Sequence, residues 1–510
     1  MHMKSFTRIK KINGQEYIYE ITPYYDKEKK QIRQKSKYLG KNVNGVPVKV
    51  RSQDQVPKKV LSHGEFVPLK KIAEDLELEK ILSGVLPGKE VWPILTLAMN
   101  YATRPRALTH IQSWYEGTII SEDHPDLPLS SQSLSRMLSR IGESIANLEF
   151  SRKLIQQIST CSTLVYDITS LSSYSQSISL LEYGYNRDGF DLPQINLSLI
   201  VDMDLGIPVM YDLYPGSIAD VSTLKNTVRK IKAQGVRNYT MIMDRGFFST
   251  DNIEELVAAD LSFIIPPTST LKEAVSAIHS SIDDPEHLKL YEKEPLFVMP
   301  VSIEVGENKL SGYAYYDKKR EQQERSTFYK RLYDLMEVLK SKNLKHWMNP
   351  GEVFRATAKR DAKYIEWKAI DGRFQVALRK NAVSQAINKM GKFVLLYRGE
   401  FSWIECLSLY RSKDVVEKGF DVLKNDIELA NLRTNSSLGG YLFIAFIALI
   451  LRMKLTRLMI DAELNKRYSV EGLLTELEKI KIMILPDGEK ITTEITKKQR
   501  EILDALHMCA

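Results

Sequence analysis

Three carboxylates stand out in the sequence because of the residues around them. Asp167 interrupts the apolar run TLVYDITSL, and Asp244 directly follows the apolar run YTMIM. A charge in either place is costly unless it is paired or binds a metal ion. Taken alone, each aspartate is best explained as a structural residue that caps a turn or pairs with an arginine.

The third acid, Glu417, lies in LYRSKDVVEKGFDVLKNDIE, which predicts a helix with two distinct faces. At ~100° per residue, one acid, two lysines and a tyrosine fall within an arc of about 60°. The residues of this polar face are Tyr410, Lys413, Glu417 and Lys424. A separate apolar stripe would dock the helix on a core and leave the polar face along its edge. The stripe consists of Val416, Phe420, Leu423 and Ile427. By itself, such a polar face is equally consistent with an ordinary solvated surface.

Together the three acids have the composition of a divalent-metal site. Carboxylate oxygens without histidine or cysteine suit Mg²⁺ or Mn²⁺. Two such ions about 4 Å apart can activate an attacking oxygen and stabilise a leaving oxygen in phosphodiester cleavage. Lysines beside such a site favour the approach of a phosphate backbone. Glycoside hydrolysis also uses two carboxylates, but Lys413, Lys424 and a basic N-terminal region argue against it.

The composition is that of a soluble globular protein. Of 510 residues, 43% are hydrophobic and 27% charged, which at ~150 residues per domain allows about two to four structural units. Three cysteines without a CxxC pair predict neither a disulfide framework nor a zinc site. The longest apolar run, residues 441–451, is short of the ~20 residues of a membrane helix and predicts a core helix behind the catalytic sheet. No signal-peptide pattern or GxxxxGK[ST] loop occurs, so we expect a cytoplasmic protein without a nucleotide cofactor.

The positive charge is concentrated in the N-terminal region. The whole chain carries a net charge of +8, whereas residues 1–70 contain 16 Lys and Arg against six Asp and Glu, a net charge of +10. A basic module ahead of a near-neutral body favours a nucleic-acid partner over a merely solvated basic surface.

The elements that must position the acids are predicted within six segments. These are a small basic β unit (1–60), a helical region (61–160), the first part of a catalytic core (161–267), a mixed α/β insertion (268–398), a helical completion of the core (399–460) and a C-terminal helical tail (461–510). In the second segment, SSQSLSRMLSRIGESI predicts a helix capped by Ser130 or Ser131. Its Arg136 and Arg140 would suit the recognition helix of a helix-turn-helix, although such amphipathic helices are common.

The first core segment predicts the order β-β-β-α-β-α-β, which forms a mixed sheet with flanking helices. A turn at 204–206 joins the second and third strands, and the next helix begins near Asp220 and ends at Gly235. Asp167 lies on the first of these strands and Asp244 at the end of the fourth.

This strand order, with its two aspartates, resembles the ribonuclease-H-like core of DDE transposases. The segments IMDRGF, GYNRDG and DLYPGSIADVSTL and the helix of Glu417 are similar to bacterial and archaeal transposases of the insertion-sequence-4 (IS4-like) superfamily. That group carries a Tyr-Arg-Glu-Lys signature around its third acid. Tyr410, Glu417 and Lys424 fall at its spacing, while Lys413 takes the place of the arginine and lacks its bidentate fork. The resemblance covers roughly residues 160–455.

The resemblance implies a cut-and-paste DNA transposase with endonuclease activity. Such an enzyme would bind the terminal inverted repeats of its own mobile element through its N-terminal region and pair the two ends as a homo-oligomer, expected to be a dimer. It would hydrolyse the end phosphodiester, and the freed 3′-OH would attack target DNA in DNA recombination.

The resemblance also assigns roles to individual residues. Asp167, Asp244 and Glu417 would be the catalytic acids and would hold two Mg²⁺ or Mn²⁺ ions. The residues expected to contact DNA phosphates are Tyr410, Lys413 and Lys424. Arg245 would either do the same or pair with a neighbouring acid.

Two other functions stay open from the sequence. One is a catalytically retired, transposase-derived DNA-binding protein, and the other is a stand-alone RNase-H-like nuclease. In relatives that form a hairpin intermediate, an aromatic residue of the insertion stacks on a displaced base. Trp347 and Trp367 lie in the corresponding region, where core packing is the simpler expectation for both.

Overall fold

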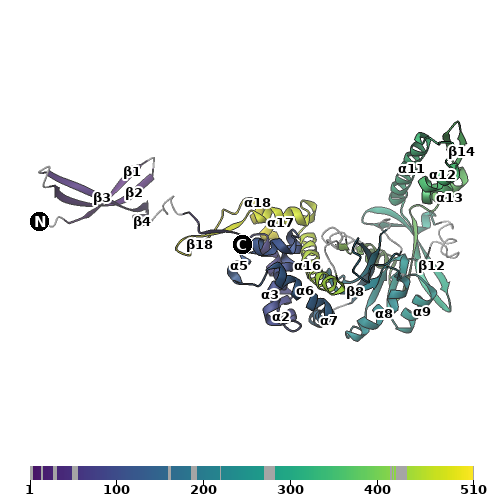
Figure 1. Ribbon diagram of the computed structural model, residues 1–510, viewed down its shortest axis with the longest axis horizontal. Coiled ribbons are helices and arrows are strands. Elements are labelled where there is room, and N and C mark those ends of the chain that lie inside the picture. The colour runs from purple at the N-terminus through teal and green to yellow at the C-terminus, as the bar shows by residue number, and fades with distance from the viewer. Residues whose placement is uncertain are drawn as a thin grey trace. The chain divides into compact units, whose positions relative to one another are not determined.

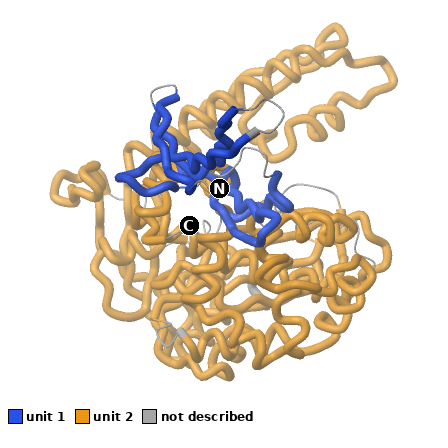
Figure 2. The backbone as a smooth tube through the Cα atoms, turned by 90° about the vertical axis from the view of Figure 1, so that its left-hand side faces the viewer, with its two compact units in different colours: residues 1–63, 478–496 blue, residues 64–477, 497–510 orange. Residues whose placement is uncertain are grey.

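The computed structural model of the chain describes residues 4–12, 15–26, 31–48, 56–158, 162–184, 192–218, 220–268, 282–413, 416, 419–420 and 434–508 (Figure 1). It divides into two compact units (Figure 2). Unit 1 consists of residues 1–63 and 478–496, and unit 2 of residues 64–477 and 497–510. The chain therefore passes from unit 1 into unit 2, returns to unit 1 over residues 478–496 and enters unit 2 again at residue 497.

Unit 1 contains two antiparallel sheets. The first has the strand order β1-β2-β3-β4, with β1 (Phe6–Ile12), β2 (Gln15–Asp26), β3 (Gln31–Val43) and β4 (Val46–Val48). The second has the order β18-β17-β5, with β5 (Lys59–Ser62), β17 (Lys481–Ile484) and β18 (Lys490–Thr492). The prediction of a helical tail over residues 461–510 is therefore wrong in part, because the strands β17 and β18 lie within it. Lys481 pairs with Ser62, 419 residues earlier, and a local pattern cannot reveal so distant a partner.

Helices form a large part of unit 2, among them one long apolar helix, α16 (Asn435–Asp461). They are α1 (Phe66–Asp75), α2 (Leu78–Ser83), α3 (Gly88–Thr103), η1 (Leu108–His110), α4 (Ile111–Glu116), α5 (Ile120–Asp123), α6 (Ser131–Glu143), α7 (Ala146–Ile158), α16 (Asn435–Asp461), η6 (Leu464–Lys466), α17 (Val470–Glu478) and α18 (Lys497–Ala505). Helix α16 contacts α1, α3, α6 and the sheet strand β8 (Ile207–Pro215). Among the described helices only α16 is long and apolar enough to cross a membrane, but 89% of its most apolar stretch is buried inside the protein. The predicted core helix is therefore confirmed.

A nine-stranded mixed sheet with the order β11-β12-β13-β16-β10-β9-β6-β7-β8 lies in unit 2. The strands predicted around the two aspartates are β6 (Thr163–Ser172), β7 (Gln194–Asp202), β8, β9 (Thr240–Met243) and β10 (Ser262–Ile265), with helices α8 (Asp220–Ala233) and α9 (Thr250–Ala258). Strand β7 runs antiparallel to β6 and β8, whereas β9 is parallel to β6 and β10. This is the predicted element order, and Gly235 adopts a φ of +94° after α8. The expectation of an α/β fold with a large mixed sheet is confirmed.

The structure corrects the predicted insertion over 268–398, because four of its strands extend this same sheet. They are β11 (Leu288–Tyr291), β12 (Glu294–Val305), β13 (Asn308–Tyr316) and β16 (Lys392–Arg398). Strand β16 pairs antiparallel with both β10 and β13, so the extension is continuous with the core. Hydrophobic alternation predicts a strand but not its neighbour, and this is why the sheet could not be extended from sequence.

A smaller group of elements stands apart from the sheet (Figure 1). It comprises α11 (Lys318–Ser341), α12 (Pro350–Ala358), η4 (Lys359–Tyr364), β14 (Ile365–Ile370), β15 (Arg373–Leu378) and α13 (Lys380–Ile387). These elements enclose small cores of their own, one around Leu339 and Phe354 and one around Phe328 and Leu332.

Candidate active site

Asp167 lies on β6, and Asp244 directly follows the neighbouring parallel strand β9. In the ladder between these strands, Tyr166 lies beside Met243, the last residue of β9, so the next residue in each segment is one of the two aspartates. Adjacent strands lie about 4.8 Å apart. The register therefore brings together two acids that are far apart in the sequence.

The two aspartates lie on the face of the sheet opposite α8. Tyr166 is buried on the α8 face, where its hydroxyl donates to Thr223 Oγ1 at 2.7 Å and its ring packs against Phe247. Since side chains alternate along a strand, Asp167 points to the other face. That face carries α14 (Trp403–Ser412), which contacts β9 and β16.

Asp244 is held by two residues from the end of α14. The Tyr410 hydroxyl donates to Asp244 Oδ1 at 3.3 Å, and Lys413 Nζ lies 3.3 Å from the same oxygen. The lysine ammonium also lies 5.6 Å from the centre of the Tyr410 ring. The Lys413 side chain is only 12% exposed, whereas that of Asp244 is 46% exposed. The carboxylate is therefore accessible while its cation is covered.

These contacts keep Asp244 ionised. Burial raises the pKa of Asp244, but the charge of Lys413 and hydrogen bonds from the Arg245 backbone, Lys413 and Tyr410 outweigh it, so the pKa lies below its ordinary value. Burial also raises the pKa of Tyr410 to about 12, with the Asp244 charge adding to this and Lys413 opposing it. At neutral pH the tyrosine is thus a donor and the aspartate an acceptor.

The start of α14 is fixed by a capping box and by the sheet. The Ser402 hydroxyl accepts from Glu405 N at 3.3 Å, and Glu405 Oε2 accepts from Ser402 N at 2.8 Å. From β13, Tyr313 and Tyr315 donate hydroxyl hydrogen bonds to the carbonyls of Phe401 and Trp403 at 3.1 and 2.8 Å. The strands that extend the sheet therefore position the helix that contacts Asp244. The pattern S-x-x-E from Ser402 to Glu405 is typical of a capping box and could have predicted the start of α14 from the sequence.

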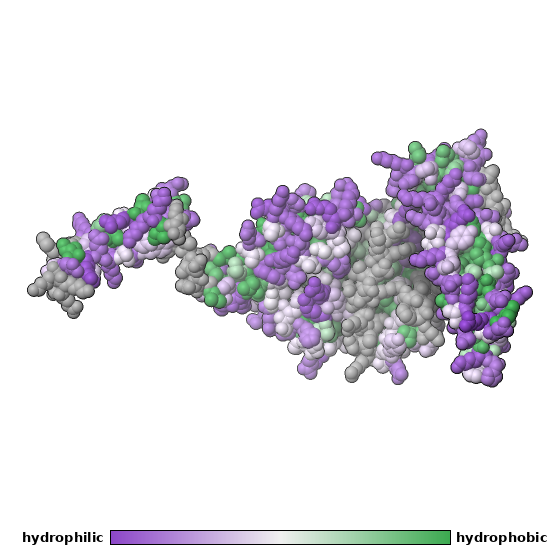
Figure 3. Space-filling view, turned by 90° about the horizontal axis from the view of Figure 1, so that it is seen from above, coloured by the Kyte–Doolittle hydropathy of each residue, from purple (hydrophilic) through white to green (hydrophobic). Residues whose placement is uncertain are grey.

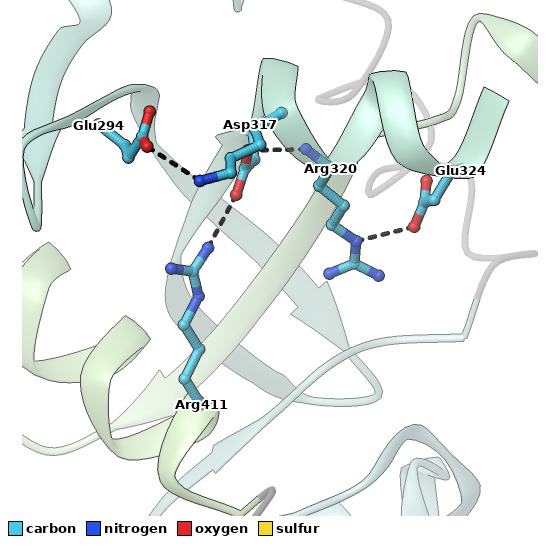
Figure 4. A network of polar contacts seen from close by, with 6 residues as sticks. Glu294, Asp317, Arg320, Glu324 and Arg411 are labelled. Atoms are coloured by element: carbon cyan, nitrogen blue, oxygen red, sulfur yellow. Dashed lines mark hydrogen bonds and ion pairs between the residues drawn. The ribbon is translucent and has the colours of Figure 1, made fainter. Parts of the chain in front are cut away.

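Helix α14 is also joined to α11 by an ion pair (Figure 4). Arg411 donates to Asp317 Oδ2 at 2.9 Å, while Asp317 Oδ1 accepts from Arg320 N at 3.0 Å and caps α11. Arg411 is therefore directed to Asp317, whereas Lys413 occupies the position beside Asp244. Sequence reasoning missed Asp317, because nothing local distinguishes it from other helix-capping aspartates.

The other predicted site residues are placed less completely. Glu417 and Lys424 lie outside the described residues. Arg245 follows Asp244 in the short helix η2 (Arg245–Phe247), where its side chain is exposed and forms no ion pair with a described acid. Within the described part of the chain, no group of three or more His, Cys, Asp or Glu residues could hold a metal ion.

The two tryptophans of the insertion differ in their surroundings. Trp367 packs against Phe354 and Phe374, as expected for a core residue. Trp347 is 66% exposed, so the expectation of core packing is wrong for Trp347. Among the cysteines, Cys406 is buried, and burial raises the pKa of its thiol to about 12.

Helix α6 is capped by Ser130 and buries its apolar side in unit 2. Its Arg140 pairs with Glu90, whereas Arg136 is exposed, and a role of this helix in reading DNA stays a prediction.

Comparison with known proteins gives one family match. A model of the family described as the transposase DDE domain matches residues 158–452, which is more than half of the chain. Among solved structures, the chain is similar to the piggyBac transposase in a cryo-EM structure of its synaptic complex with hairpin DNA, with 10% sequence identity, a TM-score of 0.36 and coverage of 81% of this chain and 79% of that chain. That likeness is too low to establish a shared fold. No curated protein sequence gives a significant match. The matched region contains both aspartates and the end of α14, and the chain belongs to the family of transposases with a DDE domain.

Proposed function

We propose that the protein is a cut-and-paste DNA transposase of the IS4-like group, which acts on the terminal inverted repeats of its own element. The observation that carries the proposal is the contact of Asp244 with Tyr410 and Lys413, beside the register neighbour Asp167. A lysine beside acids that would hold a metal ion suits a phosphodiester better than a neutral substrate.

The sheet supports a ribonuclease-H-like core. Its part β8-β7-β6-β9-β10 combines two antiparallel pairs with two parallel pairs, and the acids follow the parallel pairing of β6 and β9. This matches the arrangement that the resemblance to DDE transposases implies.

The residues fit a divalent cation. Asp167 and Asp244 offer hard oxygen donors from adjacent positions, and the lowered pKa of Asp244 keeps it charged. Together with Glu417 they would hold Mg²⁺ or Mn²⁺, two ions in all. Bound there, the ions would activate the attacking oxygen and stabilise the leaving oxygen.

The remaining polar residues would orient the DNA. Lys413 and Tyr410 already lie at Asp244 and would contact the phosphate next to the cut, and Lys424 and the exposed Arg245 would contact its neighbours. The partners would be duplex DNA of the element ends and the target, bound by a dimer in the cytoplasm. The exposed Trp347 is the better of the two tryptophans for stacking on a displaced base.

The test is cleavage of labelled duplex DNA carrying the element's own terminal repeats, with Mg²⁺ or Mn²⁺. We expect nicking or strand transfer at the repeat end by the wild-type chain and none by Asp244→Asn. Asp251→Asn, an exposed acid in the first turn of α9, is the matched control and should retain activity.

The other outcomes would contradict the proposal. Tight binding to repeat ends without cleavage would indicate a retired DNA-binding protein. Equal cleavage of any DNA would indicate a stand-alone nuclease.

A further inference from the structure

The sheet β1-β2-β3-β4 has two faces that differ in charge. Strand pairing defines them: Arg8 lies beside Tyr19, Lys10 beside Tyr17, and Tyr17 beside Lys41. Because paired residues share a face and neighbours alternate, these residues belong to one side of the sheet. We call this side the tyrosine face. Its central residues are Arg8, Lys10, Tyr17, Tyr19, Tyr38 and Lys41.

Among the described residues, the tyrosine face carries no carboxylate. Its other members are Phe6, Ile12, Gln15, Ile21, Pro23, Tyr25, Ile32, Gln34, Ser36, Val43, Val46 and Val48. All three of its charged residues are therefore cations. A polyanion approaching this side meets attraction without a compensating repulsion.

The opposite side, called here the mixed face, is different. It has the cations Lys11, Arg33, Lys35 and Lys37, but also the acids Glu16 and Glu20. Both acids accept hydrogen bonds, Glu16 from Asn42 at 2.8 Å and Glu20 from Ser5 at 3.0 Å. The positive charge of unit 1 is thus least opposed on the tyrosine face.

The rings of the tyrosine face support its cations. The centre of the Tyr38 ring lies 6.1 Å from that of Tyr17 and 5.4 Å from that of Tyr19. Lys10 Nζ lies 4.9 Å from the centre of the Tyr19 ring. Tyr17 and Tyr19 are half-buried by these contacts, so they offer less ring surface for stacking on a free base. The space-filling view shows this sheet as mainly hydrophilic with separate apolar side chains (Figure 3).

We propose that the tyrosine face binds the sugar-phosphate backbone of duplex DNA without reading its sequence. The cations would neutralise phosphates and the tyrosine hydroxyls would donate to them. This inference rests on the proposed function, since it adds a second DNA contact to a transposase whose chemistry takes place in unit 2. The sheet would bind DNA of any sequence, while other parts of the protein would recognise the specific DNA site.

The test compares two charge-matched triple variants of the full-length chain. The face variant is Arg8→Gln, Lys10→Gln and Lys41→Gln. The control variant, on the mixed face, is Lys11→Gln, Lys35→Gln and Lys37→Gln. Binding to a short duplex of arbitrary sequence is measured by fluorescence anisotropy at several salt concentrations between ~50 and ~200 mM. Far-UV circular dichroism checks that both variants are folded.

We expect the face variant to lose roughly a hundredfold in affinity near 0.15 M salt, and the slope of log K against log salt to fall by about 2.7. In the control variant, both the loss of affinity and the decrease of the slope should be much smaller. Equal losses in the two variants would show a general charge effect and overturn the proposal. No loss in the face variant, or no binding by the wild-type chain, would also overturn it.

The two proposals can fail separately, because this assay involves no cleavage. If the repeat-end cleavage test fails while the face variant still loses binding, the transposase function is wrong and the DNA-binding face stands. If cleavage succeeds and the two variants bind DNA equally well, the transposase function stands and the DNA-binding role of the tyrosine face is wrong.

Discussion

At the scale of single residues, the contact between Lys413 and Asp244 determines the charge of the candidate site. The lysine is almost covered and lies 3.3 Å from the carboxylate oxygen, so its charge is screened less than at an exposed surface. Tyr410 adds a neutral hydrogen bond to the same oxygen. The site therefore holds an accessible, ionised acid beside a nearly covered cation.

Replacing Lys413 should change the pH dependence of cleavage as well as its rate. The pKa of Asp244 lies below its ordinary value because of Lys413, so the acid stays ionised until the pH falls through that lowered pKa. In Lys413→Met the pKa rises, and protonation begins at a higher pH. We expect the acidic limb of the single-turnover rate to move to higher pH, with a rate loss of roughly 10- to 100-fold at neutral pH.

Lys413→Arg is the matched control for this prediction. It keeps the positive charge and supplies the fork of the family signature, so it should retain most of the rate and the original acidic limb. An unshifted limb in Lys413→Met would contradict the assigned contact.

At the scale of elements, Asp317 joins the helix beside the acids to the group that stands apart from the sheet. It accepts from Arg411 on α14 and from the backbone of Arg320 at the start of α11. The two functions can be separated by substitution. Asp317→Asn keeps a good helix cap and removes the ion pair, whereas Asp317→Ala removes both.

We expect Asp317→Ala to lower the free energy of unfolding by about 1 kcal/mol more than Asp317→Asn, because Ala is a poor cap. The loss in Asp317→Asn itself should be under ~1 kcal/mol, since the pair is partly exposed. Urea unfolding followed by circular dichroism gives both values. Equal losses would show that the ion pair, not the cap, is what Asp317 contributes.

Two glycines set how closely α6 approaches α16. A Cβ on Gly142 would lie 1.8 Å from the Ser436 carbonyl oxygen, and one on Gly440 would lie 2.0 Å from that of Leu138. Because both neighbours are backbone, an added methyl must push the helices apart. We expect Gly142→Ala and Gly440→Ala each to cost about 1–3 kcal/mol or more, as overpacking does.

Gly88→Ala is the control for the two glycines. A Cβ there meets nothing within 4 Å, and alanine favours a helix by about 0.5–1 kcal/mol over glycine, so α3 should be unchanged or more stable. A Gly142→Ala protein as stable as Gly88→Ala would contradict the close packing. Thermal unfolding of the three variants distinguishes these outcomes.

How much the sequence could predict depends on the distance between partners. The three-residue spacing of Tyr410 and Lys413 placed them on one helix face, and they do contact the same oxygen. The apolar runs around Asp167 and Asp244 predicted strands, and the element order followed. The contact between Arg411 and Asp317 had no local signal, since it depends on how separate segments pack. The role of Glu417 stays a prediction.

At the scale of the whole molecule, unit 1 is completed by residues from near the end of the chain. Strand β17 pairs with β5, and hydrogen bonds run from Lys58 N to the Ile484 carbonyl at 2.7 Å and from His63 N to that of Ile480 at 3.3 Å. A chain lacking residues 478–510 would leave β5 without this partner. A chain lacking only 497–510 removes α18 from unit 2 but keeps β17 and β18.

These two truncations should differ in hydrogen exchange of the amides between Lys58 and His63. In the chain that lacks residues 478–510, β5 has lost its partner strand β17. These amides should therefore exchange at the rate of an unfolded chain. In the chain that ends at residue 496 they should keep their protection, even if loss of the buried Ile502 and Leu503 lowers the stability of unit 2. Fast exchange in both chains would mean that α18, rather than β17, maintains β5. Protection in both would mean that β5 is held by something other than this pairing, and the three-stranded sheet would then be wrong.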